Sequence, residues 1–293
     1  MPTVLRSSFG LDAARAERLL EMGMAIDPAI IAGSRALFAD RLDLEMPEGG
    51  ARHYDVAYGD DPRQKLDICA TYGHRRPVVL FVPGGGFTRG DKSLYLHVPT
   101  FFAREDFVGV VMNYRLAPDF EWPEAARDVA AALDWIADRI GDCGGDPERI
   151  AVLAHSAGAA HAAAALFDGR FQPRRFASVR AVALLSGLYR IDPGAPASGV
   201  TAYFGEDPAT FDDRSPLGAA ARCTLPIVVA SAELDPPSFT RQAEALVEKL
   251  AESGNTPLVL HLERHNHVSP VMALGSRGDL LGKVLSEEFR RHL

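Results

Sequence analysis

Two patterns of apolar residues alternate along most of the chain. Six short runs are apolar almost without interruption, at residues 77–82, 107–114, 149–154, 179–186, 225–232 and 258–263. Longer stretches carry apolar residues at helical spacing, at residues 123–140, 157–167, 239–253 and 277–293. The short runs indicate strands buried on both faces, and the longer stretches indicate amphipathic helices. The alternation predicts an α/β fold with a mostly parallel central sheet and helices on both faces.

The N-terminal part of the chain follows other patterns. Residues 11–26 and 28–42 repeat apolar side chains at helical spacing, and an Asp-Pro pair separates the two stretches. Residues 53–58 and 64–72 alternate apolar and polar side chains instead. Such alternation predicts two antiparallel strands near a sheet edge. We therefore expect two helices and then a strand pair before the α/β alternation begins.

Composition narrows the class of protein and of partner. The chain has 293 residues, of which 47% are hydrophobic, so it can bury a large core. Its formal net charge of −8 argues against nucleic acid or an anionic membrane as a partner, because both need a basic surface. No apolar run has the length of a signal peptide or a membrane span. Cys69, Cys143 and Cys223 lack the close spacing of a metal site. We expect a cytoplasmic protein without a metal or cofactor.

Ser156 stands between a predicted strand and a predicted helix. The apolar run at 149–154 ends just before it, and an alanine-rich stretch begins at Ala157. A serine on such a sharp turn holds its hydroxyl out from the backbone, next to the first N–H groups of the helix, which suits a nucleophile. Gly158 allows close approach of strand and helix, whereas Ala154 stands where such turns usually carry glycine. The alternative is a serine that only caps the helix.

A nucleophilic serine also needs N–H donors for the oxyanion, a base and an acid. Three consecutive glycines begin at Gly84, directly after the strand predicted at 77–82, and glycine leaves backbone N–H groups uncovered. A phosphate-binding loop is the competing interpretation, but no Lys-Ser or Lys-Thr pair follows at the required distance. We therefore expect an oxyanion hole formed by the N–H groups of Gly85, Gly86 and Ala157.

Candidates for the acid and the base follow the last two apolar runs. Asp235 and Glu233 come after the fifth run, and we prefer Asp235 because the proline that follows it fixes an extended turn. His267 and His265 come after the sixth run, and we prefer His267 because it lies farther into the loop. The order serine, acid, histidine is that of the α/β-hydrolases and differs from the trypsin-like and subtilisin-like orders. Four such features at strand ends favour Ser156 as a nucleophile.

Nearly the whole chain resembles the hormone-sensitive-lipase-like esterases of the α/β-hydrolase fold. Four motifs carry the resemblance: PGGGFTRGDK at 83–92, NYRLAPDFEWPEAARDVAAALDWI at 113–136, GGDPERIAVLAHSAG at 144–158 and ELDPP at 233–237. The resemblance implies that Ser156, Asp235 and His267 form a catalytic triad. It also implies that residues 1–45 form a small helical cap and 46–293 the catalytic domain, to whose cap or rim 188–216 would add.

Two departures from this family bear on the substrate. Pro83 stands where the family usually has histidine before the glycines, and His155 makes the turn read HSAGA instead of the commoner DSAGG. That turn is closer to kynurenine-formamidase-like enzymes, which cleave a small N-formyl amide. The sequence predicts a serine hydrolase for a small to medium, largely apolar ester, with an amidase or formamidase as the alternative. A hydrolase fold that only binds a small molecule is an alternative of another class.

Phe87, Trp122 and Phe204 are the apolar candidates for the substrate pocket. Pockets for small molecules are lined largely by such side chains. Aromatic residues also fill protein cores, and for each of the three a core position is the more frequent outcome. Both interpretations stay open at the level of sequence.

Overall fold

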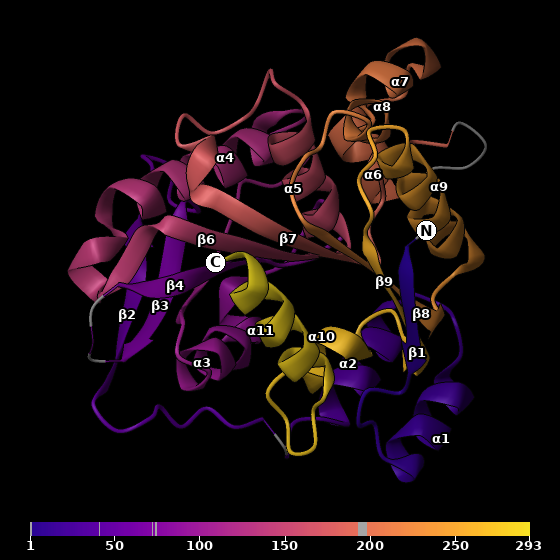
Figure 1. The fold of residues 1–293 in the computed structure, drawn as a ribbon. Helices are drawn as coiled ribbons and strands as arrows, with labels where there is room; N and C mark the ends of the chain where they lie inside the picture. Colours follow the sequence, from indigo (N-terminus) through magenta and orange to yellow (C-terminus); the bar gives the residue numbers. More distant parts are fainter. Residues whose placement is uncertain (1, 41, 72, 74, 193–197) are drawn as a thin grey trace.

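A computed structural model describes residues 2–40, 42–71, 73, 75–192 and 198–293. Within these ranges, one sheet contains nine strands (Figure 1). In chain order they are β1 (Thr3–Ser7), β2 (Gly50–Ala57), β3 (Lys65–Thr71), β4 (Arg76–Val82), β5 (Val108–Met112), β6 (Gly145–His155), β7 (Val179–Leu185), β8 (Ile227–Leu234) and β9 (Leu258–Asn266). Their order across the sheet is β1-β9-β8-β7-β6-β4-β5-β3-β2.

Most of the sheet is parallel, as the continuous apolar runs predict. Every neighbouring pair from β1 across to β5 is parallel. β3 then runs antiparallel to β5, and β2 runs antiparallel to β3 at the edge. Because parallel strands end at the same side of a sheet, the carboxyl ends of β4, β6, β7, β8 and β9 lie along one side, where ligands of such sheets bind.

Helices cover both faces of the sheet (Figure 1). They are α1 (Ala13–Met22), α2 (Pro28–Ala36), α3 (His97–Arg104), α4 (Glu124–Arg139), α5 (Ala157–Phe167), α6 (Ser198–Phe204), α7 (Phe211–Arg214), α8 (Leu217–Ala220), α9 (Pro237–Ala251), α10 (Ser269–Ala273) and α11 (Leu281–His292). Alternate residues of β4 show the two layers. Val78, Leu80 and Val82 join the core under α4, α5 and α9, whereas Val79 and Phe81 join the core under α3, α10 and α11. The predicted α/β fold is confirmed.

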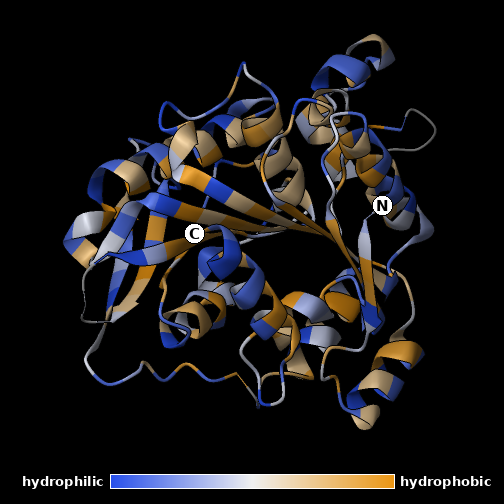
Figure 2. Ribbon diagram, viewed as in Figure 1, coloured by the Kyte–Doolittle hydropathy of each residue, from blue (hydrophilic) through white to orange (hydrophobic). Residues whose placement is uncertain are grey.

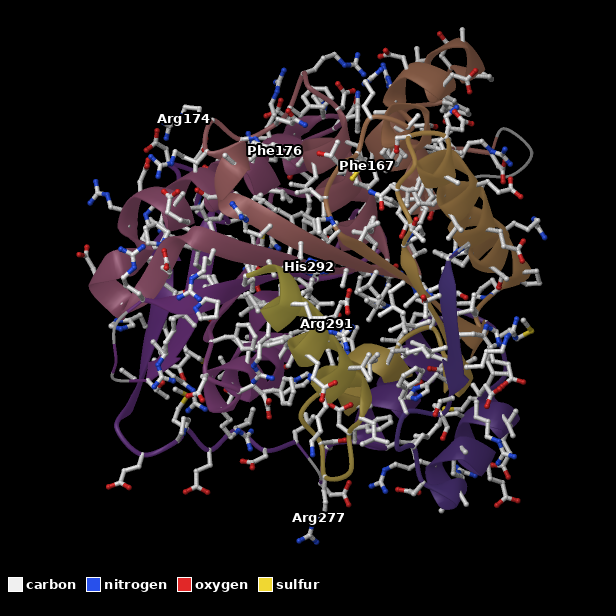
Figure 3. All side chains as sticks on the ribbon, viewed as in Figure 1. Phe167, Arg174, Phe176, Arg277, Arg291 and His292 are labelled. Atoms are coloured by element: carbon white, nitrogen blue, oxygen red, sulfur yellow. The ribbon has the colours of Figure 1, made fainter. Side chains whose placement is uncertain are left out.

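The hydropathy of the ribbon follows this layering. In Figure 2 the strands are mostly hydrophobic, and many helices carry hydrophilic residues alongside hydrophobic ones. Figure 3 labels examples of both environments. Phe167, the last residue of α5, is 2% exposed, whereas Arg174 and Arg277 are exposed at the surface. Among the described residues, no helix combines the length and apolar character that crossing a membrane requires.

The N-terminal segment is joined to the sheet through β1. This strand pairs in parallel with β9, from Thr3 opposite Leu258 to Ser7 opposite Leu262. The sequence does not predict it, because its five residues are mostly exposed and leave no apolar alternation. The two predicted helices follow as α1 and α2, and α2 is tied to β9 by a hydrogen bond that the Asn266 amide donates to the Ser34 hydroxyl.

Candidate active site

Ser156 forms the turn between β6 and α5. The strand ends at His155 and the helix begins at Ala157. Ser156 has φ of 55° and ψ of −123°, a backbone conformation that residues other than glycine rarely adopt and that is common at functional turns. A Cβ on Gly158 would lie 2.3 Å from the carbonyl oxygen of Val82, so only glycine lets α5 begin this close to the end of β4.

The Ser156 hydroxyl lies beside His267. Its Oγ atom is 2.8 Å from Nε2 of the imidazole, and the Nδ1 atom of the same ring is 2.6 Å from Oδ1 of Asp235. The three side chains follow β6, β8 and β9, so each comes from the carboxyl end of a different strand. The structure thus brings together the three residues that strand-end reasoning selected.

Asp235 is fully buried, at 0% exposure, and is held by several donors. Its Oδ2 atom accepts the Ser186 hydroxyl at 2.6 Å and the Ala232 N–H at 2.8 Å. Burial alone would raise the pKa of Asp235, but the hydrogen bonds from His267, Ser186 and Ala232 outweigh it and lower the pKa below its ordinary value. An ionised carboxylate only accepts hydrogen bonds, so Nδ1 of His267 carries the proton and Nε2 is free to accept one from Ser156.

The two rival residues have other partners. Glu233 is exposed, and its carboxylate accepts a backbone N–H at 2.6 Å. His265 is buried between the Ser269 hydroxyl, 2.8 Å from its Nδ1 atom, and the Ser8 carbonyl, 3.1 Å from its Nε2 atom. Burial lowers the pKa of His265 to about 4, which keeps it neutral at neutral pH. Both side chains are thus occupied away from Ser156.

The three predicted oxyanion donors are uncovered. Among the described residues, the N–H groups of Gly85, Gly86 and Ala157 have no hydrogen-bond partner. A Cβ on Gly85 would lie 1.7 Å from a carbonyl oxygen of the same loop, and Gly86 has a φ of +59°, so both positions require glycine. A Cβ on Gly84 would come within 2.9 Å of Cβ of Ser156, so the loop lies directly against the serine. These N–H groups are therefore available to an oxyanion near Ser156.

Pro83 replaces the histidine that the family usually has before the glycine loop, but backbone hydrogen bonds still hold the loop at both ends. The Tyr114 hydroxyl donates a hydrogen bond to the Pro83 carbonyl oxygen at 2.9 Å. The Phe87 carbonyl oxygen accepts the Ala117 N–H at 3.1 Å on the other side of the glycines. The segment after β5 therefore holds both ends of the glycine loop, without the side chain that the family usually places before it.

Phe87, Trp122 and Phe204 lie together in an aromatic cluster. Phe87 stacks on Tyr203 with ring centroids 5.3 Å apart, and Trp122 meets Phe204 with centroids 5.7 Å apart. Phe87 and Phe204 are 4% and 1% exposed and belong to the core under α4 and α5. In this structure the three side chains pack as core next to the glycine loop, and contact with a substrate stays a prediction.

Part of the segment 188–216 borders the glycine loop. A Cβ on Gly199 in α6 would lie 2.0 Å from the Gly86 carbonyl oxygen, so the helix rests directly on the loop. The backbone N–H of Trp122 donates to the carbonyl oxygen of Tyr203 in the same helix, α6, at 2.8 Å. Residues 193–197 lie outside the described residues. The cap-or-rim role expected for this segment stays a prediction.

Two residues that the sequence reasoning did not assign to the network contact it. Ser186 follows β7, has φ of +47° and is 1% exposed. It ends one of the six apolar runs at the same side of the sheet, so strand-end reasoning applied to every run would have found it. His155 places its Nε2 atom 2.8 Å from the carbonyl oxygen of His267. No sequence signal links these two histidines, which are 112 positions apart.

The described part of the chain contains no candidate metal site. No group of three or more His, Cys, Asp and Glu side chains there could hold a metal ion. Cys69, Cys143 and Cys223 are free cysteines, and burial raises the pKa of each thiol.

Comparison with known proteins agrees with this chemistry. Residues 61–176 match the Carboxylesterase family. Esterase LipC of Mycobacterium tuberculosis is 31% identical over 217 residues, which are 67% of this chain and 54% of LipC. The chain therefore spans about half the length of this curated relative.

Solved structures share the fold over almost the full length. Inhibited esterase B from Lactobacillus rhamnosis superimposes with a TM-score of 0.74 at 20% identity, covering 95% of this chain and 97% of that one. An esterase of Pyrobaculum calidifontis gives a TM-score of 0.74 at 21% identity, covering 96% and 99%. The chain therefore shares the α/β-hydrolase fold of these esterases, and within it residues 61–176 match the Carboxylesterase family.

Proposed function

We propose that the chain is a serine hydrolase that cleaves a small to medium-sized, largely apolar carboxylic ester through an acyl-enzyme on Ser156. The observation that carries the proposal is the continuous set of contacts from Ser156 Oγ through the His267 ring to Asp235, at 2.8 Å and 2.6 Å. These are the distances at which a base takes a proton and an acid orients that base. The proposed triad is Ser156, His267 and Asp235.

In the first half of the reaction, Ser156 Oγ attacks the ester carbonyl carbon while its proton passes to Nε2 of His267. Asp235 stabilises the imidazolium that forms, because its carboxylate is ionised and bonded to Nδ1. The imidazolium then gives its proton to the departing alcohol oxygen as the carbon–oxygen bond breaks. The acyl group stays on Ser156.

The oxyanion is held by the N–H groups of Gly85, Gly86 and Ala157, which are positioned before the substrate arrives. One such donor typically contributes about 3 kcal/mol to the stability of the transition state. Water then repeats the sequence on the acyl-enzyme, with His267 as its base. The carboxylic acid leaves and Ser156 regains its proton.

The proposed substrate class rests on the relatives and on the aromatic residues next to the glycine loop. The names of the matched proteins are those of esterases, among them LipC and an isoprenylcysteine methylesterase of Arabidopsis thaliana. Next to the glycine loop lie Phe87 and the aromatic cluster, which favour an apolar acyl or alcohol group over a charged one. A small-molecule ester is therefore the proposed substrate.

Replacing Ser156 by alanine tests the proposal. We expect Ser156→Ala to lower kcat for p-nitrophenyl butyrate by at least about 10⁴-fold, because it removes the hydroxyl that lies 2.8 Å from Nε2 of His267. A fluorophosphonate probe should label the wild type and leave the variant unlabelled, while circular dichroism shows that both are folded. Substantial turnover by the folded variant would refute the role of Ser156.

The same preparation separates the ester from the two alternatives. The HSAGA turn is the feature that favours an amide, so matched substrates should share one acyl group and differ only in an ester or amide link. A higher kcat/KM for the N-formyl amide would assign the chain to the formamidases. Absence of both turnover and labelling in the wild type would leave a binding protein on a hydrolase fold.

A further inference from the structure

His155 is a buried histidine that belongs neither to the proposed triad nor to the proposed oxyanion hole. It is 4% exposed and directly precedes Ser156 at the end of β6. Its ring does not turn to the serine hydroxyl. Instead, Nε2 lies 2.8 Å from the backbone carbonyl oxygen of His267, and the two imidazole centroids are 5.0 Å apart.

The chemistry of this contact fixes the protonation of His155. A carbonyl oxygen only accepts, so Nε2 carries a hydrogen and donates it. Burial, together with the nearby His267 and Arg35, lowers the pKa of His155 to about 3 against the opposing effects of the His267 carbonyl and Asp235, so the ring is neutral at neutral pH. Nδ1 then holds a lone pair and has no partner among the described residues. A Cβ on Gly84 would lie 3.1 Å from this atom, which places Nδ1 toward the glycine loop.

His155 holds the backbone carbonyl of His267, whose ring must contact both Ser156 and Asp235. His267 follows the last residue of β9, so its ring is not fixed by strand pairing. Its Nε2 and Nδ1 contacts both depend on the orientation of the backbone from which the ring projects. A donor on the adjacent carbonyl restrains that orientation. The donor directly precedes Ser156 in the sequence. The end of β6 therefore positions both the nucleophile and, through this hydrogen bond, the base.

We propose that His155 is a positioning residue, whose Nε2–H holds the His267 carbonyl and so keeps the His267 imidazole in line with Ser156 and Asp235. The inference rests on the proposed function, because it assigns His155 a part in that same reaction. A neutral ring suits the role. A charged ring 5.0 Å away would oppose the imidazolium that His267 becomes during catalysis.

Replacing His155 by glutamine or by asparagine distinguishes a positioning role from a role in packing alone. The amide nitrogen of glutamine extends to about the place of Nε2, whereas that of asparagine is shorter by one methylene and reaches only the level of Nδ1. We expect His155→Gln to keep kcat within about threefold of the wild type, because it restores the donor. His155→Asn and His155→Leu should lower kcat about 100-fold with KM changed less than about twofold, because a misplaced base slows the chemical step.

His97 provides the matched control. It is 2% exposed, its Nε2 atom lies 3.0 Å from the Val271 carbonyl oxygen, and burial lowers its pKa to about 4. It therefore makes the same kind of bond, but to a residue outside the reaction. His97→Gln and His97→Asn should differ in thermal stability and share the kcat of the wild type. If replacing His97 lowers kcat as replacing His155 does, general loosening of the fold explains both and the inference is refuted.

The readouts distinguish failure of the inference from failure of the proposed function. If the wild type neither hydrolyses the p-nitrophenyl ester nor takes the fluorophosphonate label, the proposed function fails. If the wild type is active and His155→Asn keeps the kcat of His155→Gln, the function stands and the positioning role falls. Should His155→Leu not fold, the glutamine and asparagine variants decide, because both remain polar and differ by the one methylene that sets where the donor lies.

Discussion

Asp235 and Asp279 are both almost fully buried, at 0% and 7% exposure, yet their pKa values move in opposite directions. The pKa of Asp235, after β8, is lowered. The pKa of Asp279, in the turn before α11, is raised to about 6. Burial raises both, because it disfavours a charged carboxylate. The partners of the two carboxylates must therefore account for the difference.

The two sets of partners differ in kind. Asp279 accepts backbone N–H groups, from Gly275 at 2.8 Å and from Gly282 at 3.0 Å. Asp235 accepts a backbone N–H as well, and in addition a hydroxyl from Ser186 and the Nδ1–H of His267. Backbone donors and the charge of Lys283 do not offset the burial of Asp279, whose pKa stays raised, whereas the imidazole and the hydroxyl keep Asp235 ionised. A fixed negative charge is thus maintained where an imidazolium would develop.

Asp235→Asn is the strongest test of this contrast. We expect kcat for the p-nitrophenyl ester to fall by about 10⁴-fold, because an amide neither stabilises the imidazolium nor fixes the proton on Nδ1 of His267. The measurement is steady-state hydrolysis at neutral pH, with near-ultraviolet circular dichroism to show that the core is intact. Asp279→Asn in the same assay should retain the kcat of the wild type.

Glu233→Gln, at the end of β8 and two residues before Asp235, is the matched control. Glu233 is exposed and accepts a single backbone N–H, from Arg264, so removing its charge should change kcat less than about twofold. A large loss for Glu233→Gln, together with a small loss for Asp235→Asn, would exchange the two assignments. The sequence alone offers both carboxylates at this strand end, so the pair of variants also tests the preference for Asp235.

Sequence patterns predicted the parts of this molecule that depend on local periodicity. The six apolar runs became β4 to β9, because strands buried on both faces must be apolar throughout. The sharp turn at Ser156 and the glycines from Gly84 onward were predicted because each requires particular residues at one place in the chain. The choices of Asp235 and His267 followed from strand ends, and the structure places His267 against Ser156 and Asp235 against His267.

Contacts between distant segments escaped the sequence patterns. β1 was missed because edge pairing with β9 uses backbone groups and leaves its side chains exposed. The contact of His155 with the His267 carbonyl depends on how β6 and the β9 loop approach each other. The position of Ser186 at a strand end is visible in the sequence, but its hydrogen bond to Asp235 forms only because β7 and β8 are neighbours in the sheet.

Ser186→Ala should remove one of the hydrogen bonds that Asp235 accepts and leave the others in place. The variant loses a 2.6 Å bond to a buried carboxylate, so we expect a loss of about 2 kcal/mol in the free energy of unfolding. Because that bond lowers the pKa of Asp235, its removal raises that pKa, so the stability that Asp235 contributes should be lost at a higher pH on acidification. We expect kcat at neutral pH to fall about tenfold.

Ser286→Ala is the control for Ser186. Ser286 is 0% exposed on α11, and its hydroxyl has no partner among the described residues. Removing an unpartnered buried hydroxyl is nearly neutral or stabilising, so urea denaturation should show little loss, with kcat and its pH profile unchanged. Equal losses for the two alanine variants would mean that the Ser186 bond contributes nothing specific to Asp235.

Asp279→Asn should affect only how stability depends on pH. The raised pKa means that the folded chain holds a proton on Asp279 up to about pH 6, whereas the unfolded chain releases it near 3.8. The wild type therefore loses stability as pH rises between these two values, by at most about 3 kcal/mol from this group. The asparagine variant has no proton to lose, so its stability relative to the wild type should increase over the same interval.

Asp235 should show the opposite sign in the same measurement. Its folded pKa lies below 3.8, so the stability that it contributes is present above that value and is lost only as the pH falls toward the folded pKa. Urea denaturation at a series of pH values should then separate the two aspartates. The difference between Asp279→Asn and the wild type changes between about pH 4 and pH 6, and that for Asp235→Asn changes only below about pH 4. If both differences changed in the same interval, the two carboxylates would not have opposite pKa shifts, and the contrast between their partners would fail.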